Sequence, residues 1–290
     1  MHSFKFSHLS AGFIAVLVGF TSSVAIIFQA AESLDANQAQ LNSWMLALGI
    51  GMGTTSIILS LKFKMPIITA WSTPGAALLV TSLDGVGMSD AIGSFMLSGA
   101  FILVFGIVGW FEKIQQWIPN TIANAMLAGI LLQFGLSIFH SIESQTLLVS
   151  IMLASYLVGK RYLGNFNIPI VFAIGIIVCL LTGMFDSQPV TIMFATPVWT
   201  QPSLSLSTII SVAIPLFIVT MTSQNLPGAA TLKAAGYQAP LSASLKVTGL
   251  CTLLLAPFGG FSFNLAAITA AICCAEDADK NPNTPYLAAI

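Results

Sequence analysis

The stretch MPIITAWSTPGAALLVTS, residues 65–82, is apolar at both ends but carries Ser, Thr, Pro and Gly at its middle. A second stretch of this kind, APFGGFSFNLAAITAAICC at residues 256–274, is interrupted by Pro257, Gly259 and Gly260. Pro removes a backbone donor and clashes with the preceding turn, so neither stretch is expected to form one regular helix. We expect a short half-helix in each stretch, the second one beginning near Ser262.

The surrounding chain carries very little charge. Of its 290 residues, 56% are hydrophobic and only 7% are charged, namely nine Lys or Arg and ten Asp or Glu. A soluble domain is about 25% charged, so this composition excludes a soluble enzyme or binding module. The net charge of -1 also argues against nucleic acid as a partner, because few cations are present to neutralise phosphates. The sequence therefore predicts a polytopic membrane protein in a lipid bilayer.

Long intervals without charge separate the few ionised residues. A helix needs about 20 apolar residues to cross the hydrocarbon core, and unbroken runs such as AGFIAVLVGF (11–20) favour helices over alternating strands. We therefore predict an all-α fold. Its ten hydrophobic elements are expected at residues 9–30, 43–61, 66–83, 91–111, 116–139, 144–159, 167–185, 207–231, 241–257 and 262–275.

The basic residues indicate how the chain is oriented. With ten elements threaded through the membrane, all nine Lys and Arg fall on the side that holds the N-terminus. Acidic residues alone, such as Glu32, Asp84 and Asp186, occupy the opposite loops. Because Lys and Arg concentrate in cytoplasmic loops, the N-terminus is predicted to be cytoplasmic, in a bacterial inner membrane.

The two broken elements predict a binding site. Irregular backbone at membrane depth persists only where it is buried in protein or lines a cavity, and paired discontinuous helices point to the substrate site of a transporter. A half-helix that starts at mid-membrane presents free N–H groups and a positive dipole end, which attract a carboxylate. Trp71, Phe261 and Phe263 are candidates for aromatic walls. The alternative is that Pro and Gly only kink packed helices.

A third polar group lies in the eighth element, where TMTSQN (220–225) precedes Pro227 and Gly228. Polar side chains in an apolar helix find partners inside the bundle. They either join helices to one another or line the cavity, and the nearby Pro-Gly pair favours the cavity. The closely spaced glycines of GIGMGTT (49–55) lack a preceding strand, so they are interpreted as a small-residue packing face and not as a nucleotide loop.

Other chemistry is not indicated. The four cysteines lie in apolar elements without ligand spacing, so no metal and no cofactor is expected. The sequence has no HExxH motif and no paired carboxylates at depth, which argues against a membrane enzyme. Proton relays in transporters normally use intramembrane Asp, Glu or His. Since no Asp or Glu lies within the ten elements, a coupled proton either travels on the substrate or uses a carrier outside this chain.

Three segments resemble the benzoate/proton symporter (BenE) family: ITAWSTPGAALL (68–79), TSQNLPGAATLKAAGY (222–237) and APFGGFSFNLAAITAAIC (256–273). The resemblance runs from the first element to the last residue, and the order and spacing of all three segments agree. The family is similar to the uracil-permease and anion-transporter fold. That likeness implies seven spans repeated with inverted topology and divided into a core domain and a gate domain.

In that fold the third and tenth elements begin with an extended piece and meet at the substrate, and the eighth contributes polar contacts. The resemblance thus implies residues 1–206 as a first repeat, with core spans 1–4 and gate spans 5–7. It likewise implies residues 207–290 as a partial second repeat, as expected for a truncated product. The implied substrate-binding residues are Trp71, Ser72, Thr73, Pro74, Gly75, Gln224, Asn225, Phe261, Ser262, Phe263 and Asn264.

The resemblance implies a secondary active transporter that takes up benzoate, or a similar small aromatic carboxylate, together with a proton by alternating access. The alternatives are a carrier of another anion or of a nucleobase-like solute on the same fold, and an inactive truncated fragment. The sequence leaves open whether the chain forms a homodimer.

Overall fold

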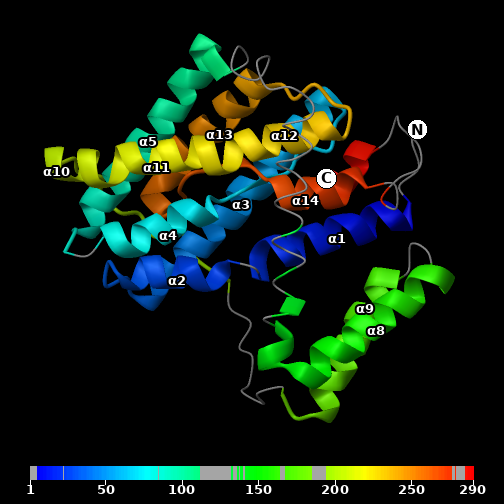
Figure 1. The fold of residues 1–290 in the computed structure, drawn as a ribbon. Coiled ribbons are helices and arrows are strands. Elements are labelled where there is room, and N and C mark those ends of the chain that lie inside the picture. The colour runs from blue at the N-terminus through cyan, green and yellow to red at the C-terminus, as the bar shows by residue number, and fades with distance from the viewer. Residues whose placement is uncertain are drawn as a thin grey trace.

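The computed structural model describes residues 5–21, 23–83, 85–111, 132, 136, 138–139, 141–163, 167–184, 194–275, 278 and 285–290. Most of these residues are helical (Figure 1). Among them, five helical stretches are long and apolar enough to cross a membrane. They are Phe6–Glu32, Gln38–Phe63, Met88–Val108, Leu206–Ala234 and Leu241–Phe258. The chain is therefore a multi-pass membrane protein, as the composition predicts. The expected element at 116–139 lies almost wholly outside the described residues.

The first expected element is divided into two helices. Helix α1 (Phe6–Thr21) ends where the chain turns, and α2 (Val24–Glu32) follows. Helix α3 (Gln38–Phe63) begins with a capping box, in which Asn37 Oδ1 accepts from the Gln40 N–H and Gln40 Oε1 accepts from the Asn37 N–H. Such reciprocal bonds satisfy two otherwise unpaired donors at the helix start. They fix the point at which α3 enters the bundle.

The third element is broken as expected. Strand β1 (Thr69–Ala70) comes first, and α4 (Thr73–Ser82) begins after a short extended link. Helix α5 (Met88–Val108) then returns along the bundle. It packs closely against α13 (Leu241–Leu255). A Cβ at Gly249 would lie 2.6 Å from the Leu103 backbone nitrogen, so only small residues permit this contact.

Helices α8 (Thr146–Tyr162) and α9 (Asn167–Leu181) form a pair that is set apart from the other helices (Figure 1). They correspond to the elements expected at 144–159 and 167–185. The rings of Phe13 on α1 and Phe172 on α9 meet edge to face, with centroids 6.0 Å apart. This contact joins the pair to the rest of the bundle.

The eighth element is one long helical stretch with two wider turns. It consists of α10 (Leu206–Thr208), the π-helix η2 (Ile209–Ala213), α11 (Ile214–Thr220), the π-helix η3 (Met221–Asn225) and α12 (Leu226–Ala234). Each π segment closes on the amide of the residue before a proline, namely Ile214 and Leu226. Proline cannot donate to the helical ladder, and π turns at such positions are frequent at functional sites.

The tenth element is also broken, but at a different residue from the one expected. After α13 come the 3-10 turn η4 (Ala256–Phe258), strand β2 (Asn264–Leu265) and helix α14 (Ala267–Cys274). The expectation of a half-helix beginning near Ser262 was therefore wrong. Ser262 has φ +43, and the next residues are extended because their amides bond to β1 and to neighbouring side chains.

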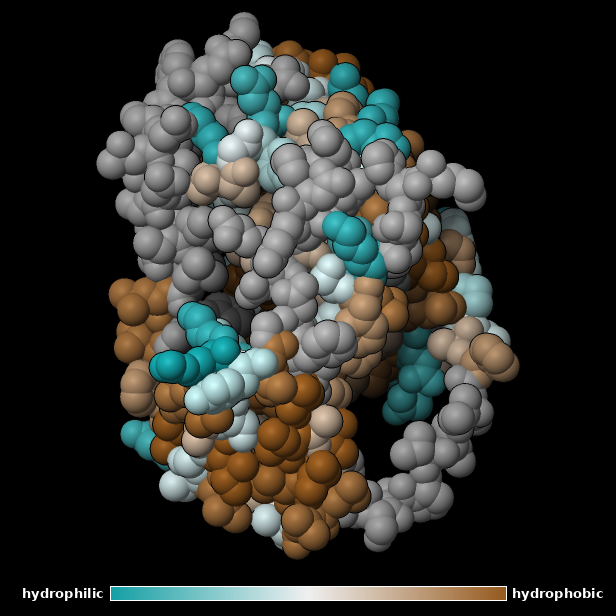
Figure 2. Space-filling model, turned by 90° about the vertical axis from the view of Figure 1, so that its right-hand side faces the viewer, coloured by the Kyte–Doolittle hydropathy of each residue, from teal (hydrophilic) through white to brown (hydrophobic). Residues whose placement is uncertain are grey.

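The C-terminal turn η5 (Pro285–Ala289) packs beside α1 and α14. A Cβ at Gly12 would lie 2.8 Å from the Ala288 carbonyl oxygen, and the Lys64 ammonium lies 4.6 Å from the centre of the Tyr286 ring. On the face shown in Figure 2, hydrophobic residues form a broad area over the lower part of the molecule. The exposed apolar side chains of the whole molecule include Leu9, Phe13, Val16, Ile107, Leu157, Val158, Leu180 and Leu254. A surface of this kind fits contact with lipid and not with water.

Candidate functional site

The two broken elements meet in the interior of the bundle. Strands β1 and β2 pair in antiparallel fashion, with Thr69 opposite Leu265 and Ala70 opposite Asn264. The Ala266 N–H extends the ladder by donating to the Ile68 carbonyl oxygen at 3.0 Å. Helices α4 and α14 each begin within three residues of this ladder. The expectation that the third and tenth elements start with an extended piece and lie together is confirmed.

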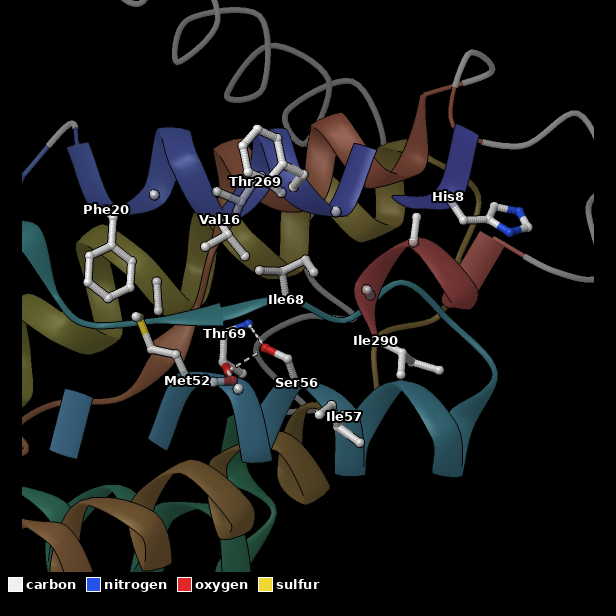
Figure 3. Close-up of a pocket in the computed structure, with 18 of the residues that line it drawn as sticks. His8, Val16, Phe20, Met52, Ser56, Ile57, Ile68, Thr69, Thr269 and Ile290 are labelled. Atoms are coloured by element: carbon white, nitrogen blue, oxygen red, sulfur yellow. Dashed lines mark hydrogen bonds between the residues drawn. The ribbon is translucent and has the colours of Figure 1, made fainter. Parts of the chain in front are cut away.

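Helix α3 covers the β1 edge of the ladder with hydroxyl groups. The Thr69 N–H donates to Ser56 Oγ at 2.9 Å, as Figure 3 shows, and the Ile67 N–H donates to Ser60 Oγ at 3.1 Å. The hydroxyls of Thr55 and Thr69 are 2.6 Å apart. Sequence reasoning missed these contacts, because Ser and Thr in helices commonly bond their own preceding turn and so give no distinct signal.

The β2 edge of the ladder is covered by two other helices. The Leu265 N–H donates to Asn225 Oδ1 at 3.0 Å, and the Phe263 N–H donates to Thr252 Oγ1 at 3.2 Å. Asn225 and Asn264 are both fully buried, and Asn264 Nδ2 donates to the Ser262 carbonyl oxygen at 2.8 Å. The structure thus brings Asn225 of the eighth element into direct contact with the tenth.

The start of α4 is capped by its own residues. Ser72 Oγ accepts from the Gly75 N–H at 3.0 Å, and the Ser72 carbonyl oxygen accepts from the Ala76 N–H at 2.7 Å. Pro74 has no N–H, so the Thr73 N–H is the only one in residues 73–76 not engaged in these ways. A Cβ at Gly75 would lie 2.7 Å from Ser72 Oγ. The α4 terminus therefore offers a positive dipole and one amide, whereas α14 has no capping side chain.

The aromatic residues expected as cavity walls lie in the protein core. Trp71, Phe261 and Phe263 are at most 2% exposed. The Phe261 ring packs against Phe95 with centroids 5.4 Å apart, and a Cβ at Gly51 would lie 2.2 Å from the Phe263 ring. Gly51 is therefore a close-packing position, as expected for a small-residue packing face over residues 49–55, whereas nothing lies within 4 Å of a Cβ at Gly53.

The polar residues at 220–225 of the eighth element differ in burial. Thr220 precedes the π segment η3, and the other four lie within it. Asn225 and Thr220 are fully buried, Gln224 is half-buried, and Thr222 and Ser223 are exposed. Thr220 Oγ1, Ser262 Oγ and Asn264 Oδ1 have no hydrogen-bond partner among the described residues. Buried polar atoms without partners are unusual in proteins. Ser262 and Asn264 lie beside and in β2, and Thr220 lies at the end of α11 in the eighth element.

A cavity of about 460 Å³ opens beside the ladder (Figure 3). It lies between α1, α3, β1, α14 and η5, and its lining is mostly apolar. It reaches the strand at Thr69 and Ala70 and includes His8 and Thr269 at its polar positions. None of the eleven residues predicted to bind substrate lines this cavity. Gln224 and Asn225 come from the eighth element, and the other nine come from the third and tenth elements, in or beside the ladder segments.

A multi-pass helical protein whose two interrupted apolar segments meet inside the bundle has the architecture of a secondary membrane transporter. The chain belongs to the BenE family: the family model described as benzoate membrane transport protein matches residues 2–290.

Two relatives support this assignment. The chain is 45% identical over 281 residues to the inner membrane protein YdcO of Escherichia coli (strain K12), covering 97% of this chain and 72% of the relative. It is 36% identical over 280 residues to the benzoate membrane transport protein of Acinetobacter baylyi (strain ATCC 33305 / BD413 / ADP1), covering 97% and 71%. The family is one of membrane transporters and not of enzymes. A benzoate-like substrate is the one this family implies.

Proposed function

We propose that this chain takes up benzoate, or a similar small aromatic carboxylate, together with a proton across the bacterial inner membrane. The observation that carries the proposal is the β1–β2 ladder. Helices α4 and α14 both begin within three residues of it. Helix N-termini favour anions, and a relative 36% identical to this chain is named a benzoate membrane transport protein.

The proposed substrate site surrounds the β1–β2 ladder. The carboxylate lies near the Thr73 N–H and the uncapped start of α14, where two helix dipoles act on the same negative charge. Gln224 is half-buried on the π segment η3 and supplies a polar contact from the eighth element. Trp71, Phe261 and Phe263 shape the site from the core behind it, since their rings are buried among other side chains.

We also propose that the molecule is built from two related halves. The order helix, helix, strand and half-helix occurs in α2 to α4 and again in α12 to α14. The two strands pair in antiparallel fashion, as an inverted repeat requires. Alternating access then follows from a rocking motion of the ladder-bearing core against the remaining helices.

Proton coupling requires no acidic side chain at membrane depth in this scheme. Asp90 lies in the first turn of α5, and Glu32 is the last residue of α2, so both are at helix ends. One proton that moves with one carboxylate makes the transported species net neutral. Neutral cargo avoids the cost of carrying charge through the apolar interior.

Uptake measurements test the proposal. The full chain, reconstituted in liposomes, is expected to accumulate radiolabelled benzoate when the outside is made acidic. Unlabelled benzoate should compete, whereas sulfate and uracil should not. Absence of benzoate uptake, or equal competition by sulfate or uracil, would contradict the assignment of an aromatic carboxylate as substrate.

A further inference from the structure

A two-stranded ladder inside a membrane has two open edges, and each edge carries backbone amides that water cannot reach. The outward N–H groups belong to Thr69 on β1 and Leu265 on β2, and to Ile67 and Phe263 just before these strands. The Ile67 N–H also donates to the Met65 carbonyl oxygen at 2.8 Å. All four donate to a side chain of a neighbouring helix. Three of the acceptors are the hydroxyls of Ser60, Ser56 and Thr252, and the fourth is the amide oxygen of Asn225.

Asn225 differs from the three hydroxyl acceptors in where it comes from. Ser56, Ser60 and Thr252 lie on α3 and α13, which are regular α-helices. Asn225 ends the π segment η3, one position after the half-buried Gln224. In this π turn Gln224 is half-buried, whereas the neighbouring Asn225 side chain is fully buried and contacts the backbone of β2.

The Asn225 side chain is held from both ends. Its Nδ2 lies 3.5 Å from the Thr220 carbonyl oxygen and 3.5 Å from Met221 Sδ, so the amide oxygen is oriented toward Leu265. The eighth element approaches β2 closely one turn later, where a Cβ at Gly228 would lie 2.6 Å from Leu265 Cβ. The Asn225 side chain is 0% exposed.

We propose that Asn225 is a positioning residue of the transport site, which fixes the junction between β2 and α14 by accepting from the Leu265 N–H and does not itself touch the substrate. The proposal rests on the function proposed above. The junction carries the uncapped start of α14, and Gln224 shares a turn with Asn225. Movement of the eighth element is thereby transmitted to the anion-binding end of the tenth.

Amide hydrogen exchange of the full chain in detergent micelles tests the hydrogen bond directly. Asn225→Leu keeps the size of the side chain but removes the acceptor, so exchange at the Leu265 amide should accelerate roughly tenfold. Asn225→Asp keeps an acceptor oxygen and should exchange close to the wild-type rate. If the leucine variant fails to accumulate, Asn225→Ser replaces it, because its hydroxyl is too short to reach Leu265.

A matched control is available in α9. Asn167 is also buried and also donates to a backbone carbonyl, that of Tyr156 at 3.1 Å, but it lies away from the ladder. Asn167→Leu should leave exchange at Leu265 unchanged. Unchanged exchange in the Asn225→Leu or Asn225→Ser variant would overturn the proposal, as would equal acceleration in the Asn167 control.

Uptake kinetics distinguish positioning from direct contact. Asn225→Leu should raise the KM for benzoate, whereas loss of folded protein alone would lower only the maximal rate. Asn225→Gln keeps a neutral amide acceptor, so its KM should fall toward the wild-type value to the extent that it restores slow exchange at Leu265. If it restores exchange at Leu265 but leaves KM as high as in Asn225→Leu, the amide contacts the substrate and the proposal is wrong. If the wild-type chain shows no benzoate uptake, the proposed function fails, and the exchange rates still decide whether the hydrogen bond fixes the junction.

Discussion

Trp71 Nε1 donates a 2.8 Å hydrogen bond to Ser23 Oγ, which joins the third element to the point where the first one breaks. Both residues are buried, and the Trp71 ring also meets Phe20 edge to face with centroids 4.9 Å apart. The break between α1 and α2 and the break before α4 therefore support each other. A buried hydroxyl that loses its partner is costly, so this pair should be energetically coupled.

Replacement of Trp71 by Phe tests that coupling. The change keeps an aromatic ring but leaves Ser23 Oγ without its donor, and it should destabilise the fold by about 1–3 kcal/mol. Thermal unfolding in detergent of Trp71→Phe, Ser23→Ala and the double variant gives the interaction energy. Simple addition of the two single effects would show that the hydrogen bond contributes nothing.

Two glycines of α3 should respond in opposite directions to the same substitution. A Cβ at Gly51 would lie 2.2 Å from the Phe263 ring, whereas nothing lies within 4 Å of a Cβ at Gly53. Gly51→Ala should destabilise the protein by about 1–3 kcal/mol through overpacking. Gly53→Ala should be neutral or stabilising by up to about 1 kcal/mol, because alanine favours the helix.

The same thermal unfolding measurement compares the two glycine variants in parallel. Equal melting temperatures would mean that Phe263 does not pack into the gap at Gly51. The comparison is internal to one helix, so differences in detergent or expression affect both variants alike.

Two substitutions at Ser72 distinguish the hydrogen bond that caps α4 from the effect of charge at the proposed carboxylate site. Ser72→Ala removes the acceptor for the Gly75 N–H and should cost about 1 kcal/mol of stability. Ser72→Asp keeps the cap but places a negative charge at the proposed carboxylate site. It should therefore retain stability and raise the KM for benzoate, as measured by uptake. A KM unaffected by Ser72→Asp would place the substrate elsewhere.

Coupled movement of one proton with one carboxylate predicts electroneutral transport. The initial rate of benzoate uptake should follow the pH gradient and stay constant when the membrane potential is clamped with potassium and an ionophore. A rate that rises with an inside-negative potential would require at least one extra positive charge per cycle. That result would exclude the neutral-cargo scheme.

The distribution of basic residues predicts the orientation of the chain. Lys62 lies in the last turn of α3, Lys160 and Arg161 in that of α8, and Lys233 in that of α12. Single cysteines at Lys62 and Lys233 should react with an impermeant reagent only in inverted vesicles, and one at Glu32 only in intact cells. The native cysteines are first replaced by serine. Labelling of all three from one side would refute the expected topology.

Much of the architecture is readable from local chemistry. Long uncharged intervals identified the chain as a membrane protein. Pro74, Pro257 and the paired glycines indicated where two apolar elements break. The start of α14 was placed too early, at Ser262 and not Ala267, because nothing in the local sequence reveals the strand that precedes it. A strand of two residues exists only when its partner is present.

What the amino-acid sequence determined by itself is the set of segments that can enter a bilayer and the places where each stops being helical, since both depend on side chains near each other in the chain. What only the tertiary structure decided is which of these segments meet and which groups satisfy their backbones. Asn225 lies in the eighth element and Leu265 in the tenth, and their 3.0 Å hydrogen bond depends on helix packing. Packing of this kind follows from contacts between distant parts of the chain, which local pattern does not encode.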